Sequence, residues 1–310
     1  MRVVFMGTPD IAATCFKRII ADGFEIVGCY TQPDRPKGRG MKMVYSPVKE
    51  VAIANNIPVF QPATFKDEQT IEQFKALKPD ICAVVAYGRM LPQAILDTPT
   101  CGCVNIHASL LPQYRGSAPY QWAVLDGLKE TGVTAQHMVL EMDAGDVIDV
   151  ARTPIGENDT AGEVLDRLAV LGAELFMQTL AALKRGALKP EPQEEDKATY
   201  CKMLTRDSGR IDLAAPRRVI HDLIRGTNPW PGAYALLGEE KLKLWRTLLS
   251  EAEAPEELPV GGLFGDQKKG LFLRCSDGAL EITELQAPGG KKLDGKTFLR
   301  GRNIVGSVLA

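Results

Sequence analysis

Two polar side chains in the segment Val104-Asn105-Ile106-His107 could act together on a ligand. The apolar residues around them predict a strand over residues 103–107, and the two-residue period of a strand places Asn105 and His107 on one face. Ligands of open parallel sheets bind beyond the carboxyl ends of the strands. An amide and an imidazole there could donate hydrogen bonds to a developing oxyanion. A polar strand end that bonds nearby backbone is the simpler interpretation, and on spacing alone we prefer it to the functional one.

Two acidic residues, Asp143 and Asp146, flank a glycine turn after another predicted strand, residues 131–140, and are expected near the same edge of the sheet. A carboxylate beside an imidazole fixes the orientation of the ring and favours its charged form. Asp side chains also commonly bond their own backbone in such turns. We prefer this second interpretation for Asp146, whereas the residues alone leave both open for Asp143.

Other patterns argue against familiar chemistries. The turn after the first strand contains Gly7 alone, without the G-x-G-x-x-G fingerprint of a dinucleotide site. Cys101 and Cys103 are closer in sequence than the ligands of structural zinc sites usually are, so we expect no metal. Ser109 lacks the G-x-S-x-G context of a hydrolase nucleophile.

Three segments are locally basic although the formal net charge is −2. A single basic run is usually a solvated face, but three of them in a net-acidic chain are what an anionic polymer would need. Their cationic residues are Arg35, Lys37, Arg39 and Lys42; Lys197, Lys202, Arg206, Arg210, Arg217, Arg218 and Arg225; and Lys291, Lys292, Lys296, Arg300 and Arg302.

The elements that must hold these side chains alternate in the first half of the chain. Strands alternating with amphipathic helices indicate an α/β fold whose parallel sheet is covered on both faces. Thr8 and Ser46, each followed by a proline, are predicted to cap the helices that begin there. The predicted strands are residues 2–6, 24–31, 58–60, 81–86, 103–107, 131–140 and 147–152, and the predicted helices include residues 67–77 and 160–185.

Two further stretches are predicted to be irregular. Residues 32–44 contain two prolines and two glycines, so we expect neither a strand nor a helix to continue through them. Residues 186–196 are rich in proline, glycine and acidic residues, which is typical of an exposed linker. After a predicted helix at 216–225, short strands between glycine-rich turns indicate a small barrel. These strands are expected over residues 233–237, 241–248, 271–275 and 279–285.

The composition is that of an ordinary globular protein. The 310 residues are 45% hydrophobic and 25% charged, which is enough for one large or two medium domains. No apolar run is long enough to span a bilayer, and the first residues lack the features of a secretory signal. We therefore expect a cytoplasmic protein without a membrane partner, whose seven scattered cysteines are free thiols.

On these residues the chain resembles the methionyl-tRNA formyltransferases, a family of folate-dependent formyltransferases, along essentially its whole length. The segments around Asn105, His107 and Asp143 resemble folate-dependent formyltransferases generally. Residues 38–40 and 228–232 are more particular to the enzymes that act on tRNA. The matching segments are residues 7–10, 32–35, 38–40, 46–49, 59–62, 86–88, 105–112, 114–116, 140–146, 224–225, 228–232 and 298–301.

The resemblance implies a fold, a division into domains and a reaction. The fold is α/β, with a Rossmann-like, mostly parallel sheet followed by a smaller C-terminal OB-like β-barrel. The implied domains are a formyltransferase domain over residues 1–189, a linker over 190–205 and a tRNA-binding domain over 206–310. The implied monomeric enzyme transfers the formyl group of its co-substrate, 10-formyltetrahydrofolate, to the α-amino group of methionyl initiator tRNA for translation initiation.

The resemblance also assigns roles to individual residues. Asn105, His107 and Asp143 form the implied catalytic group, which favours the functional interpretation of Asp143. No metal is implied. The implied folate site contains Ser109, Leu110, Leu111, Pro112, Tyr87, Met90 and Leu91, and the implied tRNA contacts are Arg39, Lys42 and Lys202.

The chain departs from the family pattern at three positions, and other functions stay open. Met41 stands where relatives often have lysine, Ala108 where many have glycine, and Leu213 where tryptophan is frequent. A formyltransferase acting on an amino sugar nucleotide or a purine precursor would not need the barrel. A nucleic-acid-binding protein with an inactive catalytic domain would not need the catalytic group, and a nicotinamide oxidoreductase would need the missing glycine fingerprint.

Overall fold

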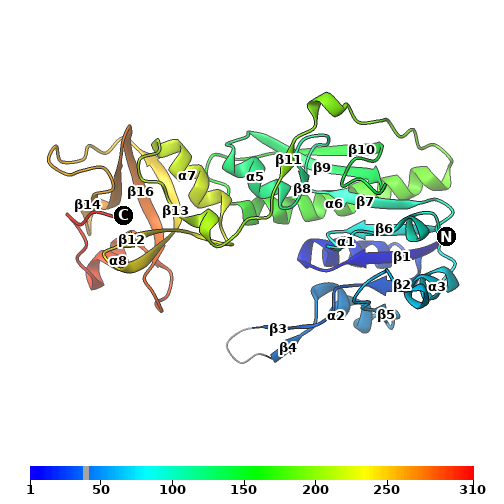
Figure 1. Ribbon diagram of the computed structural model, residues 1–310. Helices are drawn as coiled ribbons and strands as arrows, with labels where there is room; N and C mark the ends of the chain where they lie inside the picture. The colour runs from blue at the N-terminus through cyan, green and yellow to red at the C-terminus, as the bar shows by residue number, and fades with distance from the viewer. Residues whose placement is uncertain (38–41) are drawn as a thin grey trace. The chain divides into compact units, whose positions relative to one another are not determined.

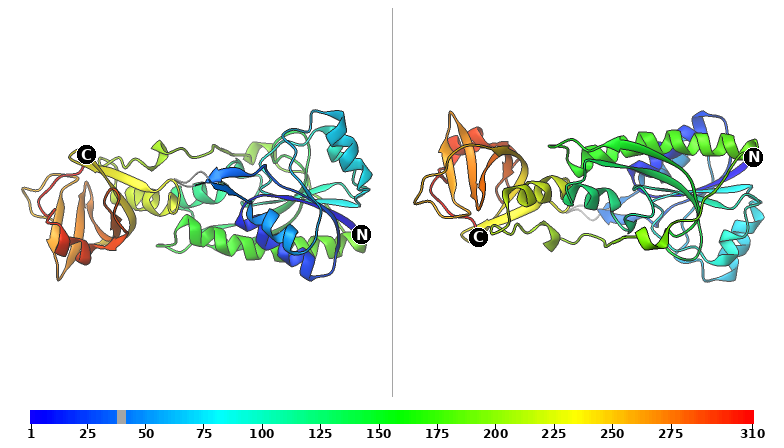
Figure 2. Two further views of the ribbon diagram at one scale, coloured as in Figure 1. Left: turned by 90° about the horizontal axis from the view of Figure 1, so that it is seen from below. Right: turned by 90° about the horizontal axis from the view of Figure 1, so that it is seen from above.

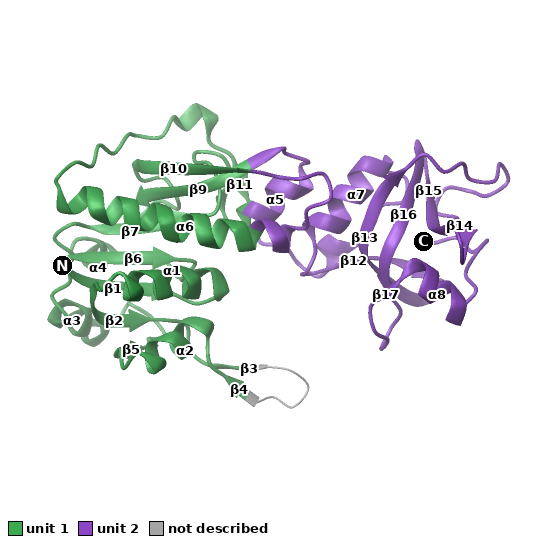
Figure 3. Ribbon diagram, turned by 180° about the vertical axis from the view of Figure 1, so that it is seen from behind, with its two compact units in different colours: residues 1–119, 131–153, 165–201 green, residues 120–130, 154–164, 202–310 purple. Residues whose placement is uncertain are grey.

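The computed structural model describes residues 1–37 and 42–310, which form two compact units (Figure 3). The N-terminal unit comprises residues 1–119, 131–153 and 165–201, and the C-terminal unit comprises residues 120–130, 154–164 and 202–310. Two short pieces from the middle of the chain therefore pack with the C-terminal residues. The functional boundaries expected at residues 189 and 205 stay a prediction.

A seven-stranded sheet forms the centre of the N-terminal unit (Figure 1). The strands from β7 to β5 are parallel, and β9 is antiparallel to β7. The mostly parallel α/β sheet predicted from the alternating pattern is thus confirmed. In sheet order the strands are β10 (Val147–Pro154), β9 (Glu130–His137), β7 (Cys103–His107), β6 (Ile81–Val85), β1 (Arg2–Gly7), β2 (Glu25–Tyr30) and β5 (Val59–Phe60).

Helices cover both faces of this sheet (Figure 2). On one face, α6 (Ala161–Lys184) packs so closely that a Cβ atom at Gly172 would lie 3.0 Å from Ile106 and 3.9 Å from Cys15 of α1 (Asp10–Ala21). Helix α2 (Pro47–Ala54) packs beside α1. On the other face, α3 (Glu68–Ala76) and α4 (Gln93–Leu96) bury Phe74 and Ile95 in one apolar cluster with Cys103.

Two local expectations are wrong. One concerns the predicted cap at Thr8, and the other concerns the predicted irregular segment, residues 32–44. Ser46 caps α2 as predicted, but Thr8 does not cap α1; its hydroxyl instead donates to the carbonyl of Tyr87 at 3.3 Å and so links β1 to the segment after β6. Within residues 32–44, β3 (Arg35–Lys37) and β4 (Lys42–Val44) pair as an antiparallel hairpin. Pro36 is compatible with this hairpin because both of its strands are edges.

Residues 190–201, most of the expected linker, belong to the N-terminal unit. The backbone of Glu191 pairs with that of Val147. A short parallel ladder then joins β8 (Arg115–Gly116) to β11 (Tyr200–Cys201), with a 3₁₀ turn at Glu195–Lys197 between these contacts. These pairings hold the stretch against the loops that follow β7 and β9.

An antiparallel barrel dominates the C-terminal unit, as the short strands predicted. Its sheet has the order β12-β13-β16-β15-β14, with β17 beside β16. Residues 306–310 close the barrel, because Leu309 bonds to Gly261 on one side and both backbone groups of Ala310 bond to Leu236 on the other. The elements are α7 (Arg217–Gly226), β12 (Ala233–Leu237), β13 (Glu240–Ser250), β14 (Leu263–Asp266), β15 (Gly270–Cys275), β16 (Gly278–Gln286), β17 (Leu293–Asp294) and α8 (Gly295–Gly301).

The two middle pieces of the chain, residues 120–130 and 154–164, contact α7 and the barrel. Helix α5 (Pro119–Leu125) contributes Gln121, whose amide donates to the carbonyls of Gly226 and Trp230. Glu163 pairs with Arg246 of β13 at 2.6 Å. No helix among the described residues is long and apolar enough to cross a membrane.

Substitution of Leu309 tests the barrel closure. Leu309 is 3% exposed, so Leu309→Ala should lower the free energy of unfolding by about 2–3 kcal/mol. Val308 is 43% exposed, so the control Val308→Ala should change it by less than about 0.5 kcal/mol. Urea unfolding followed by tryptophan fluorescence reports on this unit, because Trp122, Trp230 and Trp245 all belong to it. Equal effects of the two substitutions would contradict this account of the closure.

Candidate active site

Asn105 and His107 lie on the face of the sheet that carries α3 and α4. Both are buried, with 9% and 7% of their surfaces exposed. On β9, Gln136 is paired with Asn105 and Thr134 with His107. Within the part of the chain that the structure describes, the Asn105 side chain has no hydrogen-bond partner, so its amide can bond a ligand.

Asp143 reaches these side chains from an unexpected direction. We expected its loop at the carboxyl edge of the parallel strands, but β9 runs antiparallel to β7 and ends opposite Val104, toward the other edge. The loop after β9 then folds back over the face of the sheet. The Asp143 carboxylate accepts hydrogen bonds from the backbone of Gly116 at 2.9 Å and from Nε2 of Gln136 at 3.1 Å, and its Oδ1 lies 3.6 Å from Nδ1 of His107.

The imidazole of His107 lies between two acceptors. Its Nε2 is 2.9 Å from the carbonyl oxygen of Tyr114, and because a carbonyl only accepts, this nitrogen carries a hydrogen. Its Nδ1 faces the Asp143 carboxylate at the distance of an ion pair. A ring in this arrangement can take up a proton at Nδ1, so it is suited to donate hydrogen bonds or to relay a proton.

Hydrogen bonds from Thr134 of β9 hold the loop after β7 against the sheet. The fully buried hydroxyl of Thr134 donates to the carbonyl of Ser109 at 2.7 Å and accepts from the backbone of Leu111 at 3.1 Å. The Ser109 hydroxyl donates to the carbonyl of Gln113 at 2.6 Å. Of the sequence-predicted folate residues in this loop, Ser109 and Leu111 are buried, and Leu110 and Pro112 are half-buried.

The other sequence-predicted folate residues follow β6, the strand beside β7. Tyr87 and Leu91 are 2% and 3% exposed and belong to the apolar cluster, whereas Met90 is 57% exposed. The carbonyl of Tyr87 accepts from Nε2 of Gln32 at 3.0 Å. Burial raises the pKa of the Tyr87 hydroxyl, and among the described residues this hydroxyl has no hydrogen-bond partner. Because β6 and β7 are adjacent and parallel, both loops leave the same edge of the sheet.

The residues assigned to tRNA belong to different parts of the chain. Arg39 lies outside the described residues, and the side chain of Lys42 is likewise not described. Lys202 is exposed in the C-terminal unit.

At the base of the hairpin, Lys49 of α2 hydrogen-bonds Asp34 at 2.5 Å and lowers the pKa of that carboxyl. Asp34, the acidic residue beside the basic residues of this segment, is therefore paired with Lys49 of α2.

Sequence reasoning missed three residues around Asp143. Gln136 bonds its carboxylate, and Gln193 donates to the carbonyls of Asp143 and Gly145. Arg115 is 1% exposed and donates to Gln193. Gln136 could be found only from the register of β9 on β7, whereas Arg115 lies in a segment that matched the family. Gln193 gave no signal, because its surroundings have the composition of a linker.

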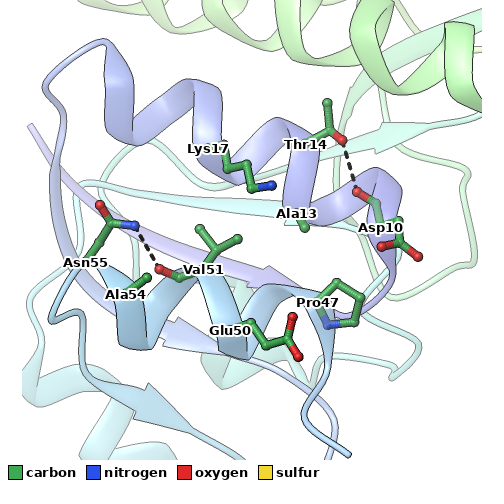
Figure 4. Close-up of a pocket in the computed structure, with 9 residues that line it drawn as sticks. All are labelled: Asp10, Ala13, Thr14, Lys17, Pro47, Glu50, Val51, Ala54 and Asn55. Atoms are coloured by element: carbon green, nitrogen blue, oxygen red, sulfur yellow. Dashed lines mark hydrogen bonds between the residues drawn. The ribbon is translucent and has the colours of Figure 1, made fainter.

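Surface shape alone does not identify this site. A hollow of about 380 Å³ lies between α1 and α2, on the opposite face of the sheet (Figure 4). Its lining contains none of the sequence-predicted site residues. Across the described residues, no three His, Cys, Asp or Glu side chains are grouped to hold a metal ion. Cys103 packs in the apolar core, whereas Cys101 is half-buried.

Thr134→Val should loosen the loop after β7. It leaves the Ser109 carbonyl and the Leu111 amide without their buried partner, so the free energy of unfolding should fall by about 1–3 kcal/mol. Amide hydrogen exchange in residues 109–113 should also accelerate. Thr179→Val is the matched control, because Thr179 is equally buried but its hydroxyl donates within α6, to Leu175. Unchanged exchange of the loop in Thr134→Val would rule out this role.

Comparisons with solved structures agree with the fold. HypX from Aquifex aeolicus in complex with tetrahydrofolic acid superimposes with a TM-score of 0.68 at 19% identity, over 96% of this chain and 47% of HypX. This chain therefore spans about half the length of HypX. WlaRD, a sugar 3N-formyl transferase, gives a TM-score of 0.67 at 18% identity over 94% of this chain and 99% of WlaRD. At such identities the likeness shows a shared fold.

Comparisons of sequence are more specific. Residues 1–180 match the formyl transferase family, and residues 203–303 match the formyl transferase C-terminal domain. The methionyl-tRNA formyltransferase of Clostridioides difficile is 41% identical, with 98% of each chain covered. That of Bacillus subtilis is also 41% identical, over 99% of this chain and 97% of the relative. The chain therefore belongs to the formyl transferase family and, within it, to the methionyl-tRNA formyltransferases.

Proposed function

We propose that the protein transfers the formyl group of 10-formyltetrahydrofolate to the α-amino group of methionyl initiator tRNA, producing N-formylmethionyl-tRNA for translation initiation. The observation that carries this proposal is the convergence of Asn105, His107 and Asp143 on one face of the sheet, in a chain that matches its relatives through both units. The enzyme acts in the cytoplasm as a monomer, with charged tRNA and the folate as its partners.

The arrangement of these residues suits formyl transfer to an amine. The amine nitrogen attacks the formyl carbon, the carbonyl oxygen becomes an oxyanion, and the bond to N10 of the folate then breaks. The amide of Asn105, which has no side-chain partner among the described residues, donates a hydrogen bond to that oxyanion. His107 exchanges the carbonyl of Tyr114 for the same oxyanion. Asp143 orients His107 and accepts the proton that the amine loses, which then passes to N10.

The folate site proposed here uses the two loops that leave the sheet after β6 and β7. One wall is the hydrogen-bonded loop after β7, which contains Ser109, Leu110, Leu111 and Pro112. Tyr87, Met90 and Leu91 form the other, where the exposed thioether chain of Met90 provides an apolar contact and the buried Tyr87 and Leu91 hold the segment in place.

Basic side chains on aromatic rings in the C-terminal unit support the proposed tRNA contact. Leu242 and Leu244 point into the barrel core, so Lys243 between them lies outward. The ammonium groups of Lys243 and Lys292 lie 5.0 and 3.7 Å from the ring centre of Trp245. Because Trp245 itself is buried, the two lysines and not the ring suit contacts with a nucleic-acid backbone. The further contacts that we assign to tRNA are Arg39, Lys42 and Lys202.

Formylation of an amino sugar nucleotide is the alternative function, since WlaRD is named as a sugar 3N-formyl transferase and has the same fold. The full-length identity to the methionyl-tRNA formyltransferases favours the tRNA substrate.

A transfer assay separates these substrates. Formyl transfer from 10-formyltetrahydrofolate is expected with charged initiator tRNA but not with uncharged tRNA, free methionine or a nucleotide-linked amino sugar. The apparent affinity for charged tRNA should fall with salt, by ~0.7–0.9 in log K per unit of log salt for each phosphate neutralised, while folate affinity changes much less. Formylation of the sugar nucleotide alone, or an affinity for tRNA that does not depend on salt, would favour the alternative.

Alanine substitution of the three catalytic residues tests the mechanism. Asn105→Ala, His107→Ala and Asp143→Ala should each lower kcat by ~10²–10⁴, the range for losing an oxyanion donor or an acid–base group. Glu141→Ala is a control from the same loop as Asp143, because Glu141 is exposed. Steady-state assays measure kcat, and unchanged circular dichroism spectra show that each variant is folded. Near-normal turnover in all three variants would remove the assigned catalytic group.

A further inference from the structure

The carboxamide of Gln193 joins the Asp143 loop to a buried arginine within the N-terminal unit. Its Nε2 donates to the carbonyl oxygens of Asp143 and Gly145 at 2.8 and 2.7 Å. Its Oε1 accepts from Nε and Nη2 of Arg115 at 3.1 and 2.9 Å. Both ends of this amide are therefore satisfied, and its orientation is fixed by the arginine.

Arg115 is itself held in place from several directions. It is 1% exposed, and its guanidinium also bonds Glu195 at 2.7 Å and the hydroxyl of Tyr200 at 3.1 Å. Its backbone lies in the β8–β11 ladder. The next residue, Gly116, donates its backbone N–H to the Asp143 carboxylate. Arg115 therefore lies between the two groups that hold the backbone and the side chain of Asp143.

The backbone of Asp143 needs such support. Its φ angle is +54°, in the left-handed region, which residues with a Cβ atom adopt rarely, although Asp does so more readily than most. The residue lies on a loop that has folded back from β9, and its carbonyl bonds Gln193. Without that bond, the loop can relax toward ordinary backbone angles, and the carboxylate would move away from His107.

We propose that Gln193 is a positioning residue, which acts through the Asp143 loop to hold the carboxylate of Asp143 against His107. The inference rests on the proposed catalytic roles of those two residues. A structural alternative is that Gln193 only attaches residues 190–201 to the N-terminal unit. Both Nε2 hydrogen bonds that Gln193 makes to backbone carbonyls go to the loop of the site, which is why we favour positioning.

The test is a double-mutant cycle between Gln193 and Asp143, measured by steady-state formylation of methionyl initiator tRNA. Gln193→Glu keeps the size of the side chain and the contact with Arg115, but it replaces the donor group with an acceptor aimed at two carbonyls. We expect kcat to fall about 10- to 100-fold, as for a misplaced catalytic group, with KM for both substrates changed less than about twofold. In the Asp143→Ala background the same substitution should have no further effect on kcat.

Two further variants keep the outcome unambiguous. Glu194→Gln changes the exposed neighbour, whose salt bridge is to Lys197, and should leave kcat unchanged. Gln193→Met removes both polar ends at similar length and should reproduce the loss if Gln193→Glu does not fold. A kcat loss that is equal in the parent and Asp143→Ala backgrounds, or no loss at all, would overturn the positioning role. Failure of the parent enzyme to formylate the tRNA would instead overturn the proposed function.

Discussion

Asn105 and His107 occupy buried positions on a sheet face where a helix would ordinarily supply apolar neighbours. Polar groups that lose water need hydrogen-bond partners, and this requirement governs what covers the end of β7. For His107 the partners are the carbonyl of Tyr114 and the carboxylate of Asp143, both supplied by loops. Asn105, in contrast to His107, has no side-chain partner among the described residues, so its amide is available to a ligand.

The antiparallel direction of β9 is what brings distant parts of the chain to this face. A parallel strand would have ended beside His107, and a short turn could then have presented an acid. Because β9 runs the other way, its loop must return across the sheet, and Asp143 is held by Gly116, Gln136 and Gln193. The site is therefore assembled from contacts between residues far apart in sequence.

Local patterns predicted the elements well where a single physical signal dominates. The strands Cys103–His107 and Ala233–Leu237 have the predicted bounds, because their apolar runs end at polar residues or turns. The hairpin of β3 and β4 was missed, because two prolines and two glycines argue against strands unless both strands are edges. The roles of Arg115 and Gln193 depend on long-range pairing of β8 with β11, which no local pattern contains.

The closure of the barrel by residues 306–310 also has a consequence for how the protein is made. Chains emerge from the ribosome N-terminus first, at about 5–20 residues per second. The outer edges of β12 and β14 therefore stay without their partner until the last of these residues has left the exit tunnel. Open strand edges are templates for pairing with other chains. Closure of the barrel therefore waits until residues 306–310 have emerged, while the strands β1 to β7 emerge much earlier.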